Sequence, residues 1–335
     1  MLNTQGRLLR RQHAPRPGSG LRVLGYTPSY LPDDPGGSEV TLHWMLRQLR
    51  ENGHEPRVLI DRDAAADHVV DDIAVVTSDS RRVAALQFDW ADVVLAQLGT
   101  RNRAIRLAAS RRRPLAFYTQ LGNTPRHAMF GNPEVNLFNS EFTLAQYPWV
   151  GDGIVFHPPV DIDDYRVERG DAITLVNLSA LKGGELFWEL ARLLPDRPFL
   201  AVRGWGAQIV PHDVPANVTL IERTPDIRSV YAKTRVLLVP SVYESYGRVG
   251  LEAACSGIPT IAHPNAGLRE ALGDAAIWAD RGDVGAWVAA LRALDDPATF
   301  ESMSARARAR VEALDPAAEF AQVESALVRA VEAAR

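Results

Sequence analysis

The stretch PSVYESYGRVGLEAACSGIPTIA, from Pro240 to Ala262, lies between two apolar segments that have the composition of buried strands. RVLLV precedes it, IPTIA ends it, and two glutamates, Glu244 and Glu252, stand eight positions apart between them. A strand, a polar loop and a helix that begins near Arg248 and ends before Gly257 account for this pattern. The spacing then puts Glu244 in the loop after the strand and Glu252 in the first turns of the helix.

Short apolar runs and amphipathic segments alternate along nearly the whole chain. In the first half, the runs expected to form buried strands begin at Leu21, Pro56, Asp92, Pro114 and Glu134. In the second half, they begin at Ala172, Pro198, Asn217, Arg235, Ile258 and Ala275. Buried parallel strands joined by helical crossovers build a doubly wound sheet, so the sequence predicts an α/β protein with two such sheets.

A segment with two prolines and several acidic residues, VFHPPVDIDDY from Val155, separates the two halves. We therefore expect one Rossmann-like domain over residues 21–158 and a second over residues 159–315. Residues 1–20 carry arginines, prolines and glycines without the apolar core of a signal peptide, and we expect them to form a disordered leader. From about Asp283 onward the pattern is helical and rich in alanine.

The composition is typical of a soluble globular protein, with 46% hydrophobic and 23% charged residues in 335. The net charge of −4 gives the chain as a whole no attraction to nucleic acid. One cysteine, Cys255, fits a reducing compartment, and no apolar run approaches the roughly 20 residues that cross a bilayer. We therefore expect a cytoplasmic protein.

Glycines also follow three other predicted strands, where α/β proteins bind ligands. Gly36 and Gly37 open a helix after a polar loop, and Lys182 precedes two glycines after the strand that ends near Leu178. The remaining pair is Arg203 and Gly204. Ordinary turn chemistry is the alternative at each place, although only two of the 37 basic residues of the chain are lysines.

The loop that carries Glu244 has the groups that a nucleotide sugar requires. A carboxylate accepts paired hydrogen bonds from sugar hydroxyls, whereas a phosphate needs N–H donors or cations. Backbone N–H groups at a helix start are free to bind such a phosphate. The candidate donor-binding residues of this loop and helix are Ser245, Tyr246, Gly247, Arg248 and Glu252. A surface loop followed by an unremarkable helical glutamate is the alternative.

These residues resemble a known family. ESYGRVGLE with EAACSGIPTIA is similar to the E-x7-E signature of retaining glycosyltransferases of the GT-B fold, in the large family four (glycosyl transferases group 1). The motifs PGGSE, NSEFT, PPVD, LKGG and GLREALG occur in the order that is usual in that family. The resemblance therefore extends from about Leu21 to the C-terminus.

The resemblance implies two Rossmann-like domains that face a cleft, with the nucleotide sugar on the second domain and the acceptor on the first. It implies that Glu244 contacts the donor sugar, that Glu252 contacts the ribose and that Lys182 neutralises the diphosphate. Gly36 and Gly37 would lie near the phosphates and the sugar. Residues 316–335 would form a final helix that crosses back to the first domain.

Two positions depart from the family pattern. Asn177 stands where an arginine often accompanies the lysine, and Arg248 or Arg203 is the candidate for the missing cation. Gln120 stands where many members have a histidine, with His127 further along, and both are candidates for acceptor binding. The resemblance thus implies a retaining hexosyltransferase that needs no metal and no cofactor beyond its nucleotide-sugar donor.

Other interpretations stay open. One is a nucleotide-sugar-binding protein without transferase activity, and another is a sugar epimerase or phosphorylase on the same fold. The acceptor is a glycan, a lipid or a secondary metabolite. Asp33 and Asp34 are expected in a solvated turn. Arginines at 101, 103, 106 and 111–113 are expected on a solvated helix face, or as a basic patch that touches an anionic membrane or acceptor.

Overall fold

The computed structural model describes residues 20–62, 66–122, 132–204 and 206–335. The chain forms two compact units: Met1–Pro159 together with Pro316–Arg335, and Val160–Asp315. Residues 1–19 of the expected leader lie outside the described residues.

The first unit is built on a sheet of eight strands in the order β3-β4-β2-β1-β5-β6-β7-β8. Its strands are β1 (Arg22–Thr27), β2 (Glu55–Ile60), β3 (His68–Val70), β4 (Ile73–Thr77), β5 (Val93–Gln97), β6 (Leu115–Thr119), β7 (Val135–Phe138) and β8 (Ile154–Val155). Each described pairing is parallel except that of β3 with β4. The central strands are buried on both faces, as their continuous apolar sequences predict.

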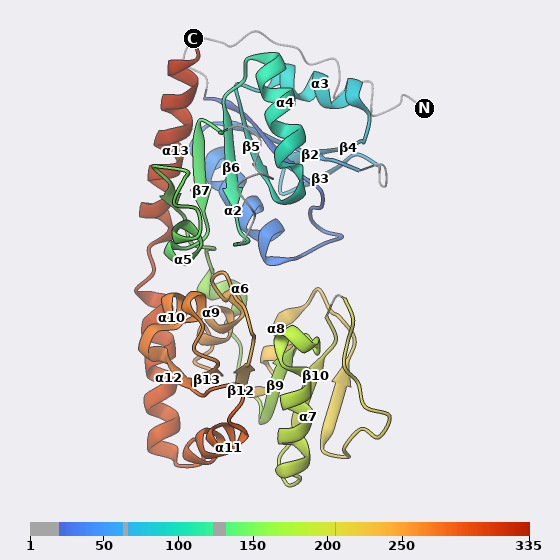
Figure 1. The fold of residues 1–335 in the computed structure, drawn as a ribbon, viewed down its shortest axis with the longest axis vertical. Coiled ribbons are helices and arrows are strands. Elements are labelled where there is room, and N and C mark those ends of the chain that lie inside the picture. Colours follow the sequence, from blue (N-terminus) through green and yellow to red (C-terminus); the bar gives the residue numbers. More distant parts are fainter. Residues whose placement is uncertain (1–19, 63–65, 123–131, 205) are drawn as a thin grey trace. The chain divides into compact units, whose positions relative to one another are not determined.

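Helices cover both faces of this sheet (Figure 1). On one face, α2 (Gly37–Glu51) and α13 (Pro316–Ala333) contribute to a core cluster with the strands. On the other face, α3 (Arg81–Trp90) and α4 (Arg101–Arg111) pack against the alternate strand residues. A short helix, α5 (Glu141–Ala145), follows β7.

The last helix, α13, is part of the first unit and runs beside β7 (Figure 1). Its residue Glu324 accepts hydrogen bonds of 2.8 Å from both Asn52 and His54. Its residue Glu319 accepts hydrogen bonds from the backbone and the ring of His157, at 2.9 and 2.8 Å. Polar contacts at two points therefore supplement the apolar packing of this helix.

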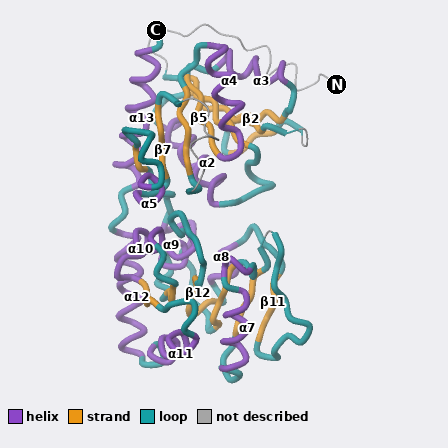
Figure 2. The backbone as a smooth tube through the Cα atoms, viewed as in Figure 1, coloured by secondary structure: helices purple, strands orange, loops and turns teal. Residues whose placement is uncertain are grey.

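The second unit has a sheet of six parallel strands in the order β11-β10-β9-β12-β13-β14. Its strands are β9 (Ala172–Val176), β10 (Phe199–Val202), β11 (Val218–Ile221), β12 (Thr234–Val239), β13 (Thr260–Ala262) and β14 (Ala276–Trp278). Its helices are α6 (Ile162–Tyr165), α7 (Gly184–Leu193), α8 (Ile227–Tyr231), α9 (Arg248–Ala254), α10 (Ala266–Leu272), α11 (Val284–Ala293) and α12 (Pro297–Glu312). In Figure 2, β12 lies between α7 and the group of α9, α10 and α12, and the two sides of the sheet have separate core clusters.

The predicted α/β class with two doubly wound sheets is confirmed by this architecture. The sequence interpretation did not include the hairpin of β3 and β4. Its turn residues Asp71 and Asp72 both have positive φ angles, of 46° and 60°, as a two-residue hairpin turn requires. Asp-Asp is a weaker turn pattern than Asn-Gly or Asp-Gly, which is why the hairpin was not evident.

Candidate functional site

The order of strands reverses between β9 and β12 in the second sheet. The chain passes from β9 outward through β10 and β11, then returns to β12 on the other side of β9. Because all six strands are parallel, the loops after β9 and β12 leave the same edge of the sheet side by side. Ligands of open α/β sheets bind at such a reversal. Lys182 follows β9 and Glu244 follows β12.

The side chains of Lys182 and Glu244 form an ion pair although 62 positions separate them in the sequence. The Lys182 Nζ lies 2.5 Å from Glu244 Oε1, and the same oxygen accepts a hydrogen bond of 2.8 Å from Ser241. The two side chains are 28% and 14% exposed, so both reach the surface of the unit. The structure thus brings together the residue expected to contact the donor sugar and the residue expected to neutralise the diphosphate.

Glycines allow the two loops to approach one another. Gly183 has φ +93°, and a Cβ on it would lie 2.3 Å from the Pro240 ring. Next to this contact, the backbone N–H of Val242 donates to the carbonyl oxygen of Leu181 at 2.9 Å. The loop of the lysine and the loop of the glutamate therefore form one packed structure.

Gly247 lets the second loop enter helix α9. Its φ is +100°, and a Cβ there would lie 2.3 Å from Leu268 Cδ2. From the other side, Gly267 packs so closely that its Cβ would lie 2.2 Å from the carbonyl oxygen of Glu244. Both positions require glycine because a side chain would displace the loop that carries Glu244.

Arg281, which the sequence interpretation did not select, braces both loops. Its guanidinium donates to the carbonyl oxygens of Ala180 at 2.6 Å and Pro240 at 3.2 Å. A longer contact of 3.4 Å reaches Leu181, and Glu185 accepts at 3.3 Å. An arginine three positions after the end of a strand of the same sheet, here β14, is the feature that could have indicated this role.

Glu252 and Arg248 form a second ion pair, inside helix α9. Arg248 Nε lies 2.8 Å from Glu252 Oε1, Tyr231 donates to Glu252 Oε2 at 2.8 Å, and Arg248 donates to the Tyr165 hydroxyl at 2.6 Å. Burial acts to lower the pKa of Arg248, but Glu252, Tyr165 and Tyr231 together outweigh it, so the pKa is raised. Burial, followed by the charge of Glu252, raises the pKa of Tyr165 to about 12. Arg248 is therefore neutralised by a carboxylate of its own helix.

Asn177 joins the ends of β9 and β10. Its side-chain oxygen accepts hydrogen bonds from the backbone N–H of Ser179 at 3.1 Å and from the amide of Gln208 at 3.0 Å. Gln208 in turn accepts from the backbone N–H of Gly204 at 2.9 Å. Gly204 lies against Asn177, since a Cβ on it would approach Asn177 Cγ to 2.3 Å. These contacts give Asn177 a structural place in the turn after β9.

The other predicted residues of the second unit differ in exposure. Arg203 follows β10, with its Nε 3.3 Å from the exposed carboxylate of Glu222. The side chain of Tyr246 is 1% exposed and belongs to a core cluster. It therefore does not line the surface of the loop. Ser245 lies in the same loop and is partly buried.

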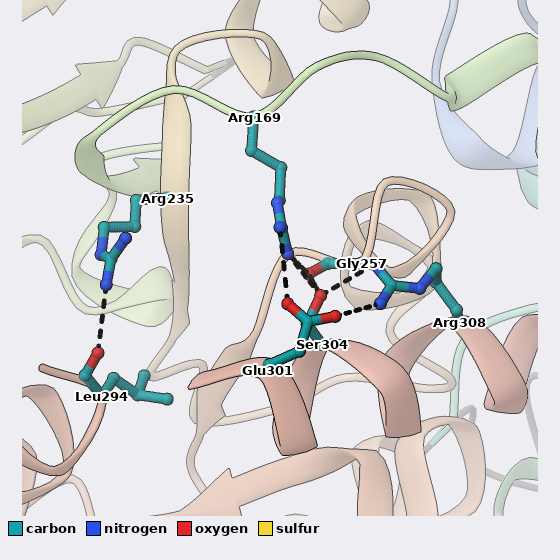
Figure 3. A network of polar contacts seen from close by, with 7 residues as sticks. All are labelled: Arg169, Arg235, Gly257, Leu294, Glu301, Ser304 and Arg308. Atoms are coloured by element: carbon teal, nitrogen blue, oxygen red, sulfur yellow. Dashed lines mark hydrogen bonds and ion pairs between the residues drawn. The ribbon is translucent and has the colours of Figure 1, made fainter. Parts of the chain in front are cut away.

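The turn that ends α9 is fixed by a polar network around Ser304 of α12 (Figure 3). Ser304 donates to the carbonyl oxygen of Gly257 at 2.6 Å, and Arg169 donates to the same carbonyl at 3.0 Å. Arg308 donates to Ser304 at 2.9 Å and to Glu301 at 2.6 Å. Figure 3 also shows Arg235, which donates to the carbonyl oxygen of Leu294. Helix α9 is thereby held at the end opposite to Gly247.

In the first unit, Gly36 and Gly37 lie at the start of α2. A Cβ on Gly36 would lie 2.5 Å from a carboxylate oxygen of Glu39, which is 5% exposed. Glu39 accepts hydrogen bonds from Ser29 at 2.6 Å and Ser38 at 3.0 Å. Glu39, a member of the PGGSE motif, was absent from the predicted site.

Gln120 follows β6 and belongs to a chain of side-chain hydrogen bonds. Its amide nitrogen donates to Gln97 at 2.6 Å, and Gln97 donates to Thr27 at 3.1 Å. The three residues end β6, β5 and β1, on both sides of the point where the strand order of the first sheet reverses. His127 lies outside the described residues.

The arginines around α4 do not share one solvated face, which corrects the sequence interpretation. Arg101 is buried, with its guanidinium 4.8 Å from the centre of the Phe117 ring. Arg103 is paired with Asp61, and Arg111 with Asp89. Arg106 and Arg112 are exposed. Asp34 lies in the turn after β1, 3.8 Å from Arg62.

Within the described ranges, no group of three or more histidine, cysteine or acidic residues could hold a metal ion. None of the helices in the same part of the chain is long and apolar enough to cross a membrane.

Known proteins resemble this chain in sequence and in fold. Residues 178–296 match the family model described as glycosyl transferases group 1. The O-antigen chain mannosyltransferase B of Escherichia coli is 37% identical over 86 residues, which are 25% of this chain and 23% of that protein. The D-inositol 3-phosphate glycosyltransferase of Kineococcus radiotolerans is 39% identical over 93 residues, or 24% and 21% of the two chains. The chain thus spans less than a quarter of the length of these curated relatives.

Solved structures share the fold over nearly the whole chain. Anabaena HepE in complex with UDP and glucose superimposes with a TM-score of 0.74 at 16% identity, over 92% of this chain and 100% of that chain. Sucrose-phosphate synthase from Thermosynechococcus elongatus gives the same TM-score and identity over 94% and 100%. The resemblance predicted from the E-x7-E stretch is therefore confirmed. Residues 178–296 thus resemble the glycosyl transferases group 1 family, and the chain has the GT-B fold of these solved structures.

Proposed function

We propose that the protein transfers a sugar from a nucleotide diphosphate donor to an acceptor hydroxyl, with retention at the anomeric carbon. The observation that carries this proposal is the pair of Lys182 and Glu244 at the strand reversal of the second sheet, 2.5 Å apart and partly exposed. The names of the curated relatives, and the UDP and glucose bound by the solved structure of similar fold, support it.

The donor would lie along the two packed loops. Lys182 would contact the diphosphate, and Glu244 would accept hydrogen bonds from the hydroxyls of the transferred sugar. When the donor binds, the ion pair of Lys182 and Glu244 must therefore open, or the Lys182 ammonium must be shared between Glu244 and the diphosphate. Glu252 would bind the ribose. A carboxylate has about four acceptor positions, and Arg248 and Tyr231 occupy two of those of Glu252.

The reaction breaks the bond between the anomeric carbon and the diphosphate oxygen, and the diphosphate leaves with the electron pair. The acceptor oxygen forms the new bond to the same carbon from the same face. Its proton passes to an oxygen of the leaving diphosphate. One close charge pair such as Lys182 with this diphosphate contributes roughly 4 kcal/mol at an effective dielectric constant near 20. Several donors must therefore act together, because enzymes lower barriers by about 8–23 kcal/mol.

We further propose that transfer requires no divalent cation, since Lys182 and the backbone N–H groups of the Glu244 loop supply the positive charge. Turnover that is unchanged in EDTA supports this proposal. Turnover that is lost in EDTA and restored by Mg²⁺ or Mn²⁺ contradicts it.

The test is incubation of the purified protein with a panel of nucleotide sugars, followed by separation of nucleotides and sugars. Slow release of nucleoside diphosphate with a free sugar of retained configuration supports the transferase. Binding without turnover, even with a panel of acceptors, would indicate a sensor of nucleotide sugars. An isomerised donor would indicate an epimerase.

The variant Glu244→Gln tests whether Glu244 belongs to the active site. It removes the charge that faces Lys182 and keeps the volume, so turnover is expected to fall at least about 100-fold with the melting temperature nearly unchanged. Glu312→Gln on the exposed surface of α12 is the matched control and should behave as the wild type. Wild-type rates in Glu244→Gln would overturn the assignment of the site.

A further inference from the structure

The first unit contains a cavity at the carboxyl ends of β5 and β6, beside the start of α4. Its volume is about 340 Å³, at the lower end of the range for small-molecule sites. The described residues that line it are Leu98, Gly99, Arg101, Asn102, Phe117, Tyr118, Thr119, Gln120, Leu121 and Tyr147. These residues include one cation, and no aspartate or glutamate is among them.

Arg101 places a desolvated positive charge in this lining. It is the first residue of α4, is 8% exposed, and its guanidinium lies 4.8 Å from the centre of the Phe117 ring. Burial lowers its pKa, which shows that the charged form is held at a cost in solvation. A charge with little water around it gains more from an arriving anion than an exposed charge does. Its planar fork of N–H donors suits a phosphate or a carboxylate.

Two side-chain amides offer acceptors for hydroxyl groups. The Oδ1 atom of Asn102 is buried and has no hydrogen-bond partner among the described residues. Such atoms are uncommon in proteins and call for a ligand or a water molecule. Gln120 uses its amide nitrogen to donate to Gln97 at 2.6 Å, so its side-chain oxygen is the atom that would accept from a ligand. The lining therefore combines a cation with acceptors of hydroxyl protons.

The rim of the cavity is apolar and firmly built. The Tyr147 hydroxyl donates to the carbonyl oxygen of Leu121 at 2.6 Å, and the Tyr147 ring packs against Phe138 and Trp149. Leu121 is 62% exposed beside it. A wall of this kind and a volume of this size suit a small compound.

We propose that this cavity binds the acceptor as an acidic polyhydroxy compound, with a phosphate or carboxylate on Arg101 and hydroxyls on Asn102 and Gln120. Only the role of this compound as the acceptor rests on the proposed function. The binding of an acidic sugar to the cavity stands on the lining residues alone.

The first experiment measures binding to the full chain without donor, by isothermal titration and by ligand-observed NMR. The probes are D-glucose, D-glucuronate and D-glucose 6-phosphate, which differ in the acidic group. One of the two acids should bind at least about tenfold more tightly than glucose, because a charge-assisted hydrogen bond is stronger than a neutral one. Tighter binding of D-glucuronate would indicate a carboxylate ligand, and tighter binding of D-glucose 6-phosphate would indicate a phosphate ligand. Equal binding of all three sugars, or none, overturns the proposal.

Variants locate the binding. Arg101→Gln should abolish the preference for the acid, and Arg101→Lys should keep part of it, since a lysine retains the charge without the fork. Arg106→Gln changes an exposed arginine of the same helix and should leave the preference unchanged. If Arg101→Gln unfolds, the comparison of Arg101→Lys with Arg106→Lys replaces it. An undiminished preference in Arg101→Gln, or in Arg101→Lys as the replacement, overturns the location.

Transfer assays with the three sugars separate this inference from the proposed function. Preferential transfer to the acid supports both. Preferential binding of the acid without transfer to any sugar keeps the cavity and contradicts its use for an acceptor. Transfer to neutral and acidic sugars with equal kcat/KM contradicts an acidic acceptor and leaves the transferase intact.

Discussion

The hydroxyl of Tyr231, the last residue of α8, donates a hydrogen bond of 2.8 Å to Glu252 of α9. Tyr231 is fully buried, and burial raises the pKa of its hydroxyl well above the usual value. The hydroxyl thus stays protonated and fixes one oxygen of the carboxylate. The orientation of the glutamate proposed for ribose binding is therefore set by a residue outside the E-x7-E motif.

Tyr231→Phe removes this hydrogen bond and keeps the ring. We expect the KM for the donor to rise about fivefold to tenfold with kcat little changed, because the bond positions a binding group. The free energy of unfolding should fall by about 1 kcal/mol. Steady-state kinetics and denaturant unfolding measure the two effects. A fall in kcat with an unchanged KM would contradict the assignment of Glu252 to donor binding.

Arg281→Ala releases the brace between the two loops. Displacement of a reacting group by about 1 Å can cost roughly 100-fold in rate, so kcat/KM should fall by 10-fold to 100-fold. Arg281→Lys should recover little, since one ammonium cannot span the carbonyl oxygens of Ala180 and Pro240 as the fork does.

The exposed Arg292→Ala of α11 is the control for this prediction and should keep wild-type kinetics. A melting temperature of Arg281→Ala that falls in step with its activity would reduce the role of Arg281 to general stability.

Gly247→Ala introduces a side chain at φ +100° and in contact with Leu268. The backbone strain alone costs about 1–2 kcal/mol, and the contact adds to it. Gly53→Ala is the comparison, since Gly53 also has a positive φ, +89°, but has open space around its Cβ position. Thermal unfolding should show the larger loss for Gly247→Ala, and turnover should be lost only in that variant.

Cys255 should be inert in the folded protein. It is 2% exposed, and burial, with the nearby Glu252, raises the pKa of the thiol to about 12. Because the thiolate is the reactive form, the thiol should not react with Ellman's reagent at pH 8. One thiol per chain should appear after denaturation. Rapid reaction of the native protein would show that α9 opens readily.

The sequence was sufficient for the strand, loop and helix around Glu244, because apolar runs and glycines report local structure. It also indicated that Lys182 and Glu244 belong to one site, since both follow strands of one parallel sheet. The i,i+4 spacing of Arg248 and Glu252 in the predicted helix is compatible with their ion pair. The sequence could not show that Tyr231 bonds to Glu252 or that Asn177 bonds to Gln208, because such pairs depend on segments from distant parts of the chain and leave no periodic pattern.

Helix α13 makes the first unit discontinuous. Phe320, Val323 and Leu327 complete the core on one face of its sheet, yet they are encoded after the entire second unit. On the ribosome, residues 160–315 are therefore synthesised before the earlier half can finish burying its apolar surface. A nascent chain halted after residue 315 would hold a complete later half and an unfinished earlier one, exposed to chaperones and proteases.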